Sequence, residues 1–452
     1  MGGQPEWPTN RQRNKNLYAL ALFSTQSPSQ ATFLQRSADE GVTYIDFLEP
    51  SMSTIPAPFQ PAQRILMGPG PSDVPNRVLR AMAAPTVGHL DPDYLRLMDE
   101  VRTMLQRIFH TDNALTLAVP GTGSAGMEAC IANLVEPGDE VIVCVAGVFG
   151  ARMKDVAERY GARVHAIEIP WGETLSYEMA KGYLDSYPTA KMFCIVHAET
   201  STGAHQPMEE LARLVSASEM LFVVDAVTSL GGMEVRVDDW KIDACYSGTQ
   251  KCLSCPPGLA PVTFSAKAIA AMDARKTKVA NWYLDMSLIR NYWSADRAYH
   301  HTAPINMTYA LHEALRVVFE EGLLERFSRH RRNHLALRAG LEAMGLNYIP
   351  ERSLYTLNCV RVPAGVNEAR VRKELLERYG IEIGAGLGPF KGQAWRIGLM
   401  GASSSERNIL MVLTALEGLL RDQNVKFPEG AGASAAAAAL KKMSLVSFDE
   451  LS

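Results

Sequence analysis

Seven short apolar segments, separated by stretches with helical spacing, dominate the sequence between about residues 115 and 265. Most of them are apolar at every position, which is typical of strands in a parallel sheet covered by helices on both faces. We therefore expect an α/β fold with a doubly wound, mostly parallel, seven-stranded sheet. The predicted strands are Leu115–Val119, Glu140–Val145, Arg163–Ile167, Met192–Val196, Leu221–Asp225, Ile242–Tyr246 and Leu259–Phe264.

The rest of the chain divides around this predicted sheet. Asp91-Pro92 has the residues of a helix start, with Asp as N-cap and Pro in the first turn. Helical spacing over residues 306–344 predicts further long helices, and the basic cluster from Arg326 to Arg332 is expected to be a solvated helix face. The expected order is an extension that is disordered or targeting (1–60), an N-terminal arm (61–85), a large domain (86–325), a smaller C-terminal α+β domain (326–425) and a flexible tail (426–452).

Composition excludes several classes of partner and cofactor. The net charge of −4, without blocks of like charge, excludes a nucleic-acid partner, and no apolar run reaches the ~18 residues of a membrane-spanning helix. The seven cysteines are scattered and odd in number, which indicates reduced, buried thiols in a cytoplasmic protein. Cys252 and Cys255 have no second pair at zinc spacing, so we expect no metal. Alternatively, the acid-poor stretch within residues 1–40 would target the chain to an organelle.

A lysine and an acid follow two of the predicted strands. Lys251 ends the segment Ser247-Gly-Thr-Gln-Lys251, and Asp225 ends the apolar run that begins at Leu221. Because α/β sheets gather their sites at the carboxyl ends of strands, the two side chains can reach one pocket. Pyridoxal phosphate needs this pair, an amine to hold its aldehyde and a carboxylate to keep its ring nitrogen protonated. The alternative is a surface lysine beside a helix-capping aspartate.

A glycine-rich turn, Gly121-Thr-Gly-Ser-Ala-Gly126, follows a predicted strand and opens a helix. Bare N–H groups at a helix N-terminus bind phosphate, and the hydroxyls of Thr122 and Ser124 suit a single terminal phosphate. The same string matches the dinucleotide fingerprint, so an NAD-dependent oxidoreductase is a rival hypothesis. Against this rival, the nearby acids Asp139 and Glu140 stand at the start of the next strand, whereas the fingerprint needs an acid near its end.

Together these motifs resemble the class V, fold-type I aminotransferases, particularly alanine–glyoxylate and serine–pyruvate aminotransferases. They occur in order between about residues 64 and 422. The matching segments are Met67-Gly-Pro-Gly-Pro71, Gly121-Thr-Gly-Ser-Ala125, Val145-Ala-Gly-Val-Phe-Gly150, His197-Ala-Glu-Thr-Ser-Thr-Gly203, Val224-Asp-Ala-Val227, Ser247-Gly-Thr-Gln-Lys251, Tyr299-His-His-Thr302, Gly386-Leu-Gly-Pro389 and Trp395-Arg-Ile-Gly398.

The resemblance implies a role for each matching position. Phe149 stands where Trp is frequent and Ser124 where His is frequent, which implies less stacking area and one changed polar contact. Tyr299 and Thr302 would reach the phosphate of a neighbouring subunit, which implies a homodimer with shared sites. The other implied roles are Lys251 as the Schiff-base lysine, Asp225 as the partner of the pyridine nitrogen, Thr122, Gly123, Ser124 and Gln250 as phosphate ligands, Phe149, Thr200 and Val227 as further cofactor contacts, Arg396 as the clamp on the substrate carboxylate, and Gly70 at the substrate mouth.

The expected function is a ping-pong transaminase that moves an amino group from alanine or serine to glyoxylate or pyruvate. Ureidoglycine and other small amines are alternative donors in the same family. A cysteine desulfurase is a rival of the same fold, but no Cys lies between Cys359 and Arg396, where that group carries its nucleophile. A cofactor-binding protein without turnover is a third alternative, which the presence of both Lys251 and Arg396 disfavours.

Overall fold

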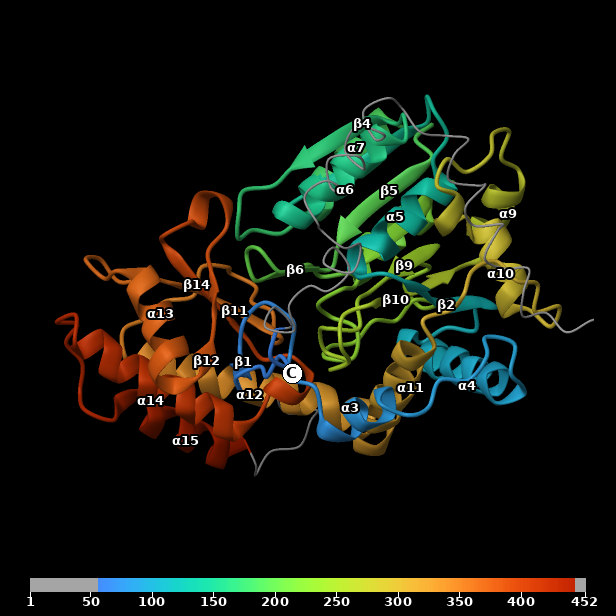
Figure 1. Cartoon of the computed structure of the whole chain (residues 1–452). Coiled ribbons are helices and arrows are strands. Elements are labelled where there is room, and N and C mark those ends of the chain that lie inside the picture. Colours follow the sequence, from blue (N-terminus) through green and yellow to red (C-terminus); the bar gives the residue numbers. More distant parts are fainter. Residues whose placement is uncertain (1–55, 444–452) are drawn as a thin grey trace, which may run out of the picture. The chain divides into compact units, whose positions relative to one another are not determined.

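The computed structural model of the chain describes residues 56–443. The predicted extension over residues 1–60 therefore falls almost wholly outside the described residues, and so do both interpretations of residues 1–40. All helices and strands described below belong to one compact unit that begins at Gln63 (Figure 1). Within residues 56–443, no helix combines the length and the apolar character needed to cross a bilayer.

A seven-stranded sheet forms the larger part of this unit. Its strand order is β2-β10-β9-β8-β5-β3-β4, and the five strands from β9 to β4 run parallel. Strand β10 is antiparallel to both of its neighbours, β9 and β2. The expected mostly parallel sheet is therefore confirmed. The strands are β2 (Leu115–Pro120), β3 (Glu140–Val145), β4 (Arg163–Glu168), β5 (Met192–Val196), β8 (Leu221–Asp225), β9 (Ala244–Tyr246) and β10 (Leu259–Phe264).

Helices that follow the strands pack back onto the sheet and bury its apolar side chains in one core. Helix α6 packs against β3, the strand that precedes it, whereas α5 packs mainly against β9 and β10. Every residue of β5, β8 and β10 is buried, which explains why these segments are apolar throughout. The helices of this part are α3 (Asn76–Met82), α4 (Pro92–Phe109), α5 (Gly123–Leu134), α6 (Val148–Arg159), α7 (Tyr177–Ser186), α8 (Glu209–Ser216), α9 (Ala266–Asp273), α10 (Met286–Trp293) and α11 (Ile305–Glu321).

The start of α4 is as the sequence predicts. The Asp91 carboxylate accepts a hydrogen bond from the Asp93 N–H at 2.9 Å, and Pro92 occupies the first helical position. This cap satisfies a backbone donor that the helix itself leaves unpaired. The apolar face is buried as its spacing requires, through Tyr94, Met98, Val101, Leu105 and Ile108.

A second, smaller core lies around a three-stranded antiparallel sheet of order β11-β14-β13. Strand β1 (Ile65–Leu66) pairs with β12 (Ile381–Glu382), so the arm before the large sheet joins the later part of the chain. Met67, in the arm, is fully buried in this second core. The remaining elements are β11 (Leu357–Arg361), β13 (Gly384–Ala385), β14 (Ala394–Gly398), α13 (Glu368–Tyr379) and α14 (Glu406–Arg421).

The helical stretch over residues 306–344 is two helices, α11 and α12 (Leu323–Ala343), separated by Gly322 at φ +88°. The expectation of a solvated basic face on α12 is wrong for Arg326. Its guanidinium is buried and donates hydrogen bonds to the carbonyl oxygens of Gly231 at 2.8 Å and Cys252 at 2.6 Å, and to Glu321. Arg326 therefore ties α12 to loops that follow strands of the large sheet.

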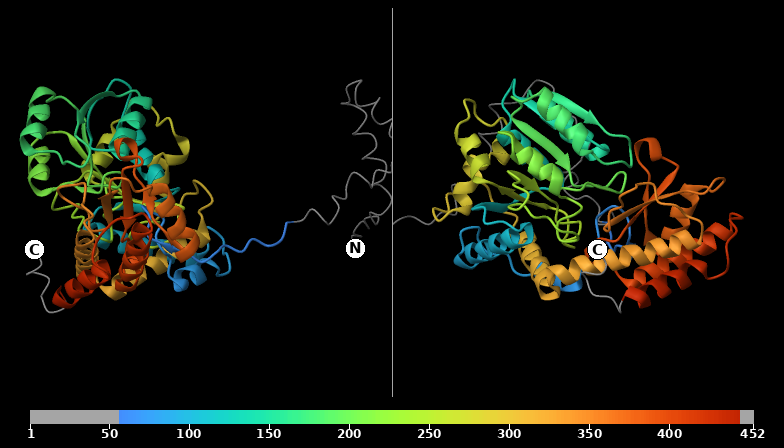
Figure 2. Two further views of the ribbon diagram at one scale, coloured as in Figure 1. Left: turned by 90° about the vertical axis from the view of Figure 1, so that its left-hand side faces the viewer. Right: turned by 180° about the vertical axis from the view of Figure 1, so that it is seen from behind.

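The alanine-rich stretch forms helix α15 (Ala431–Met443), which packs against α12 and α14 (Figure 2). The expectation of a flexible tail is therefore wrong for these residues, while residues 444–452 lie outside the described part of the chain. The helix forms because Ala has the highest helix propensity, and small residues let it approach α12 closely. A Cβ on Gly340 of α12 would lie 2.7 Å from the Gly432 carbonyl oxygen.

We predict that Ala436→Glu destabilises the protein by at least ~2 kcal/mol, because Ala436 is fully buried and the new carboxylate would have no partner. Ala437→Glu is the matched control, since Ala437 is exposed on the same helix. Urea unfolding of the two variants and the wild type measures the difference. Equal free energies of unfolding for the two variants would contradict the packing of α15.

Candidate active site

Lys251 lies in the loop after β9, and the N-terminal arm holds this loop in place. The Ser72 N–H donates to the Gln250 carbonyl oxygen at 2.9 Å, and the Ser72 hydroxyl donates to the Lys251 carbonyl oxygen at 2.7 Å. The Lys251 ammonium donates to the carbonyl oxygen of Pro69 in the same arm. Only 8% of Lys251 is exposed. The arm and the lysine loop therefore form one wall of a buried site.

Gly70 lies directly against the side chain of Lys251. Its φ of +105° is a conformation that favours glycine, and a Cβ built there would lie 2.7 Å from the lysine Nζ and 2.8 Å from its Cδ. No larger residue fits without moving the lysine. The structure thus explains the glycine at this position, which the family resemblance places at the substrate mouth.

Burial, with a smaller contribution from the nearby guanidinium of Arg396, lowers the pKa of Lys251 to about 8, while Cys252 and Asp225 oppose the change. The physical cause is that low-dielectric surroundings disfavour an ammonium ion. A substantial fraction of this side chain is therefore a neutral amine near physiological pH. A neutral amine is the form that attacks a carbonyl group.

Asp225 ends β8 and is 2% exposed. One carboxylate oxygen accepts the N–H of Val227 at 2.8 Å, and the other accepts the hydroxyl of Tyr246 at 2.8 Å. Burial raises the pKa of Asp225 to about 7, although both hydrogen bonds act in the opposite direction. Sequence reasoning missed Tyr246, yet a signal existed, because it ends β9 directly opposite Asp225 in the register of the sheet.

Two backbone loops meet at the N-terminus of α5. A Cβ on Gly123 would lie 2.9 Å from Cγ2 of Val227, and a Cβ on Gly248 would lie 3.3 Å from the Gly123 nitrogen. The side-chain oxygen of Gln250 is buried beside Gly248 and has no hydrogen-bond partner within residues 56–443. This corner therefore combines helix N–H groups with an unpaired polar side chain, the features of a phosphate site. Thr122 is the N-cap residue of the helix.

Ser124 and Phe149 are joined by a residue that sequence reasoning missed. Arg152, one turn along α6 from Phe149, donates to the Ser124 hydroxyl at 3.2 Å. Its guanidinium carbon also lies 5.1 Å from the centre of the Phe149 ring. A cation over an aromatic ring is attracted by the ring's electron-rich face. Arg152 thus contacts both Ser124 and Phe149, the two positions that differ from the residues frequent in the resembling family.

Glu199 is a second missed residue, and it fixes the start of α6. Its buried carboxylate accepts the N–H of Gly150 at 3.3 Å and the hydroxyl of Ser201 at 2.5 Å. The helix has no capping side chain of its own at Gly147, where a Cβ would lie 2.6 Å from the Glu199 carboxyl carbon. Burial raises the pKa of Glu199, while these hydrogen bonds lower it. Glu199 therefore positions the turn that carries Phe149.

Arg396 reaches the site from β14 of the smaller core. Its Nε donates to the Ala385 carbonyl oxygen at 2.7 Å and its Nη1 to the Thr200 carbonyl oxygen at 3.2 Å. Its Nη2 makes no hydrogen bond to any described residue. The Thr200 hydroxyl lies 2.5 Å from that of Thr228. Arg396 is thus oriented by two backbone carbonyls, with donor capacity left for a carboxylate.

Tyr299 and Thr302 are the predicted residues that the chain does not bring to this cluster. Tyr299 is 59% exposed, and its hydroxyl lies 3.4 Å from that of Thr302, which is also exposed. Neither bonds to Lys251, Asp225 or Gln250. The pair is therefore on the surface of the single chain, where another subunit could approach it.

The rival chemistries fit the geometry poorly. The glycine-rich turn follows β2, which is an edge strand with only an antiparallel partner, whereas a dinucleotide fingerprint follows a strand inside a parallel sheet. Cys359 is fully buried on β11, and burial raises the pKa of its thiol to about 12, which is unsuited to a nucleophile. Within residues 56–443, no group of three His, Cys, Asp or Glu side chains could hold a metal.

Comparison with known proteins identifies relatives over most of the chain. The family profile described as aminotransferase class-V matches residues 65–394. A (S)-ureidoglycine–glyoxylate transaminase of Bacillus subtilis is 40% identical over 393 residues, 82% of this chain and 94% of that protein. An alanine–glyoxylate aminotransferase of Drosophila melanogaster is 40% identical over 79% of this chain and 93% of its own length. The crystal structure of a Nostoc alanine–glyoxylate aminotransferase matches with a TM-score of 0.81 and 47% identity, over 83% of this chain and 100% of that one.

We predict that the cofactor-free chain gains stability relative to Lys251→Met as the pH rises. The pKa of the lysine is about 8 in the folded chain and 10.5 in its ordinary state, so between these values the unfolded chain binds more protons. The burial cost of the ammonium is therefore present below pH 8 and is lost toward pH 10.5, a relative gain of ~3 kcal/mol. Urea unfolding of both proteins at pH 7.5 and 10 measures it. A difference in stability that did not change with pH would show that the amine is not desolvated.

Proposed function

Because the chain belongs to the class V aminotransferase family, we propose that it is a pyridoxal-phosphate-dependent transaminase that moves an amino group from alanine or serine to glyoxylate or pyruvate. The observation that carries this proposal is a buried amine of lowered pKa, Lys251, within the electrostatic influence of the buried Asp225 and of Arg396. A pyridoxal phosphate site would explain why a lysine, an aspartate and an arginine are all buried and influence one another's charge.

The residues present fit pyridoxal phosphate. The donors at this corner suit its phosphate: the bare N–H of Gly123 at the start of α5, the hydroxyls of Thr122 and Ser124, and the side-chain NH2 of Gln250. The buried Asp225 suits its ring nitrogen. Bound there, the cofactor supplies an electron sink that stabilises the carbanion left when an amino acid loses its α-proton. Thr200, Val227 and Phe149 line the remaining sides in this proposal.

Each side chain then has a defined task. The Lys251 amine holds the cofactor and, once free, accepts and returns the α-proton as general base and acid. The Asp225 carboxylate keeps a proton on the ring nitrogen, because an anion beside the ring favours the protonated form. Arg396 binds the substrate carboxylate through the donor that the protein leaves unused, which fixes the α-C–H bond for transfer.

Glyoxylate is the acceptor that the relatives support, since it occurs in the names of both the Bacillus and the Drosophila proteins. The donor differs between these two relatives. Alanine or serine is our first proposal, and (S)-ureidoglycine is the alternative, which the Bacillus relative supports at the same 40% identity. A panel of donors with glyoxylate as the common acceptor separates the two.

We predict that the purified protein with bound cofactor absorbs visible light, and that alanine or serine converts it to the amine form of the cofactor. Stopped-flow absorbance with alanine, serine, ureidoglycine and glyoxylate measures each half-reaction. Lys251→Ala should abolish cycling, because no other described amine is placed to move the proton. If ureidoglycine is the only donor that reacts, the proposal of alanine or serine as the donor is wrong. If no amino donor reacts with the wild type, the transaminase proposal itself is wrong.

Arg396→Met should weaken alanine binding in the same assay at least tenfold, because it removes a charge-assisted hydrogen bond to the carboxylate. Arg361→Met is the matched control, since Arg361 lies on the neighbouring strand β11 but is exposed. Equal alanine affinity in the two variants would remove Arg396 from the site while leaving the lysine chemistry untouched.

We further propose a homodimer whose two sites share residues. The exposed aromatic side chains Trp282, Tyr283 and Tyr299 support an interface, because surface aromatics are enriched where proteins associate. In this proposal Tyr299 and Thr302 of each subunit reach the phosphate site of the other.

Subunit mixing tests the shared site. Lys251→Ala and Tyr299→Ala subunits should each be weak alone, but refolding them together should restore activity, because a mixed dimer contains one site with both native residues. Mixing Lys251→Ala with Lys251→Met subunits is the control and should restore nothing. Absence of recovery in a mixture shown to contain mixed dimers would contradict the shared arrangement.

A further inference from the structure

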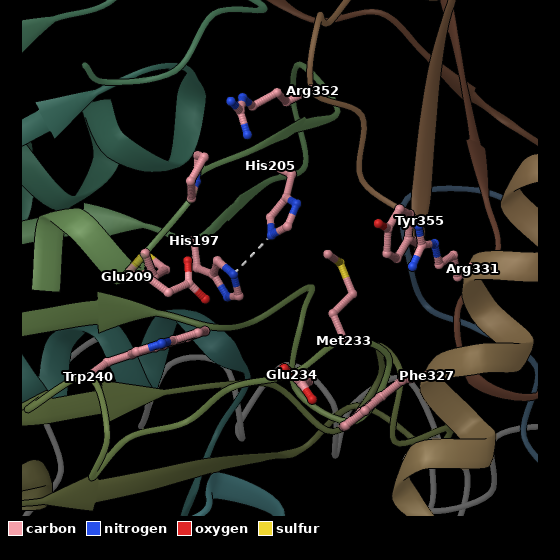
Figure 3. A pocket seen from close by; sticks show the side chains of 12 residues that line it. His197, His205, Glu209, Met233, Glu234, Trp240, Phe327, Arg331, Arg352 and Tyr355 are labelled. Carbon is pink, nitrogen blue, oxygen red and sulfur yellow. Dashed lines mark hydrogen bonds between the residues drawn. The ribbon is translucent and has the colours of Figure 1, made fainter. Parts of the chain in front are cut away.

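A second cavity, of about 320 Å³, is lined by a set of residues that does not include Lys251, Asp225 or Arg396. It lies between loops of the large sheet and the beginning of α12 (Figure 3). Its volume is at the lower end of the range of small-molecule sites. The lining residues are His197, His205, Pro207, Met208, Glu209, Met233, Glu234, Trp240, Phe327, Arg331, Arg352 and Tyr355.

Within residues 56–443, the charged side chains of this cavity have no ion-pair partner. Arg331, Arg352, Glu209 and Glu234 form no ion pair with any described residue, and Arg331 only lies over the ring of Tyr355, 5.7 Å from its centre. Arg352 and Glu209 both exert their charge on His205, which places them around the same end of the cavity (Figure 3). Arg352, Glu209 and Glu234 are exposed and Arg331 is half-buried, so two cations and two anions surround the cavity at its solvent-facing side without forming an ion pair with one another.

The histidines add no charge to this balance. The His197 and His205 rings share one hydrogen bond between their Nε2 atoms, at 3.2 Å. Burial lowers the pKa of His205 to about 4 and that of His197 well below its ordinary value, so both rings are neutral at physiological pH. The lining as a whole is therefore neutral, with separated charges of both signs, a pattern that matches a zwitterion better than a simple anion.

One wall is apolar and contains an unsatisfied donor. Trp240 is 95% buried, and its indole N–H has no hydrogen-bond partner within residues 56–443. Met208, Met233 and Phe327 complete the wall. The indole nitrogen is itself buried, so Trp240 contributes the apolar part of its ring to this wall.

The segment between the two histidines connects this cavity to the active site. Strands β6 (Ala198–Glu199) and β7 (Ala204–His205) form a short hairpin whose tip carries Thr200, the anchor of Arg396. At its base, the His197 N–H donates to the Asp225 carbonyl oxygen at 3.0 Å and the His205 N–H to the Arg352 carbonyl oxygen at 2.9 Å. A ligand that moves the base of the hairpin would therefore act on residues at its tip.

We propose that this cavity binds an α-amino acid with an apolar side chain and that the bound amino acid alters substrate binding at Arg396. Arg352 holds the carboxylate, Glu209 holds the ammonium group, and the side chain packs on the wall of Met208, Met233 and Phe327. The site is distinct from the substrate site of the proposed transaminase, and its occupation does not depend on the lysine chemistry.

Calorimetric titration of L-leucine into the full-length protein with bound cofactor tests the site. The Arg396→Met variant, in which the substrate clamp is removed, should still bind one leucine per chain, whereas Arg352→Met should bind at least tenfold more weakly. Arg361→Met is again the exposed control and should bind as the wild type does. The matched ligands 4-methylpentanoate, which lacks the ammonium group, and 3-methylbutylamine, which lacks the carboxylate, should both bind more weakly than leucine.

Four results would overturn the proposal. Leucine binding that is lost in Arg396→Met but kept in Arg352→Met would place the ligand in the substrate site, and no binding at all would remove the second site. Equal binding of 4-methylpentanoate would show an anion site instead of an amino-acid site. Finally, because coupling between two sites is reciprocal, saturating leucine must change the affinity for glyoxylate; an unchanged affinity would refute the regulatory role.

Discussion

The desolvation of one lysine amine is the interaction on which the candidate active site depends. Lys251 is covered by the N-terminal arm, and the absence of a Cβ at Gly70 leaves room for its side chain. Burial of an ammonium ion is unfavourable, so the folded chain shifts this group toward the neutral amine. The arm in turn is held by β12 and by the second core, through Met67. Residues of both cores therefore contribute to the burial of the Lys251 nitrogen.

The two buried carboxylates of this region, Asp225 and Glu199, have different structural roles. Asp225 is held by Tyr246 and by the Val227 N–H, so its position is fixed before any ligand binds. Glu199 accepts the N–H of Gly150 and fixes the first turn of α6, which carries Phe149. Arg152 then supports the same ring from outside. Phe149 is smaller than the Trp that is frequent at this position, and the contacts with Arg152 and Glu199 help to hold it in place.

Much of this could be predicted from the sequence, because the relevant signals are local. Continuous apolar runs predicted the sheet, Asp91 and Pro92 predicted the start of α4, and Lys251 and Asp225 follow strands. The missed features depend on contacts between residues far apart in the chain. Arg326 belongs to a basic segment that is typical of a solvated helix face, yet its guanidinium donates to the carbonyl oxygens of Gly231 and Cys252. The alanine-rich helix α15 carries little apolar signal, and it is ordered because small residues fit against α12.

The most direct test of the central claim is chemical labelling of the buried amine. The full-length protein would be incubated with pyridoxal phosphate, reduced with borohydride, digested and analysed by mass spectrometry. If Lys251 is the desolvated amine of the cofactor site, the pyridoxyl phosphate group will be found on the peptide that contains Lys251, at one per chain. Labelling spread over exposed lysines, or its absence from Lys251, would contradict the account.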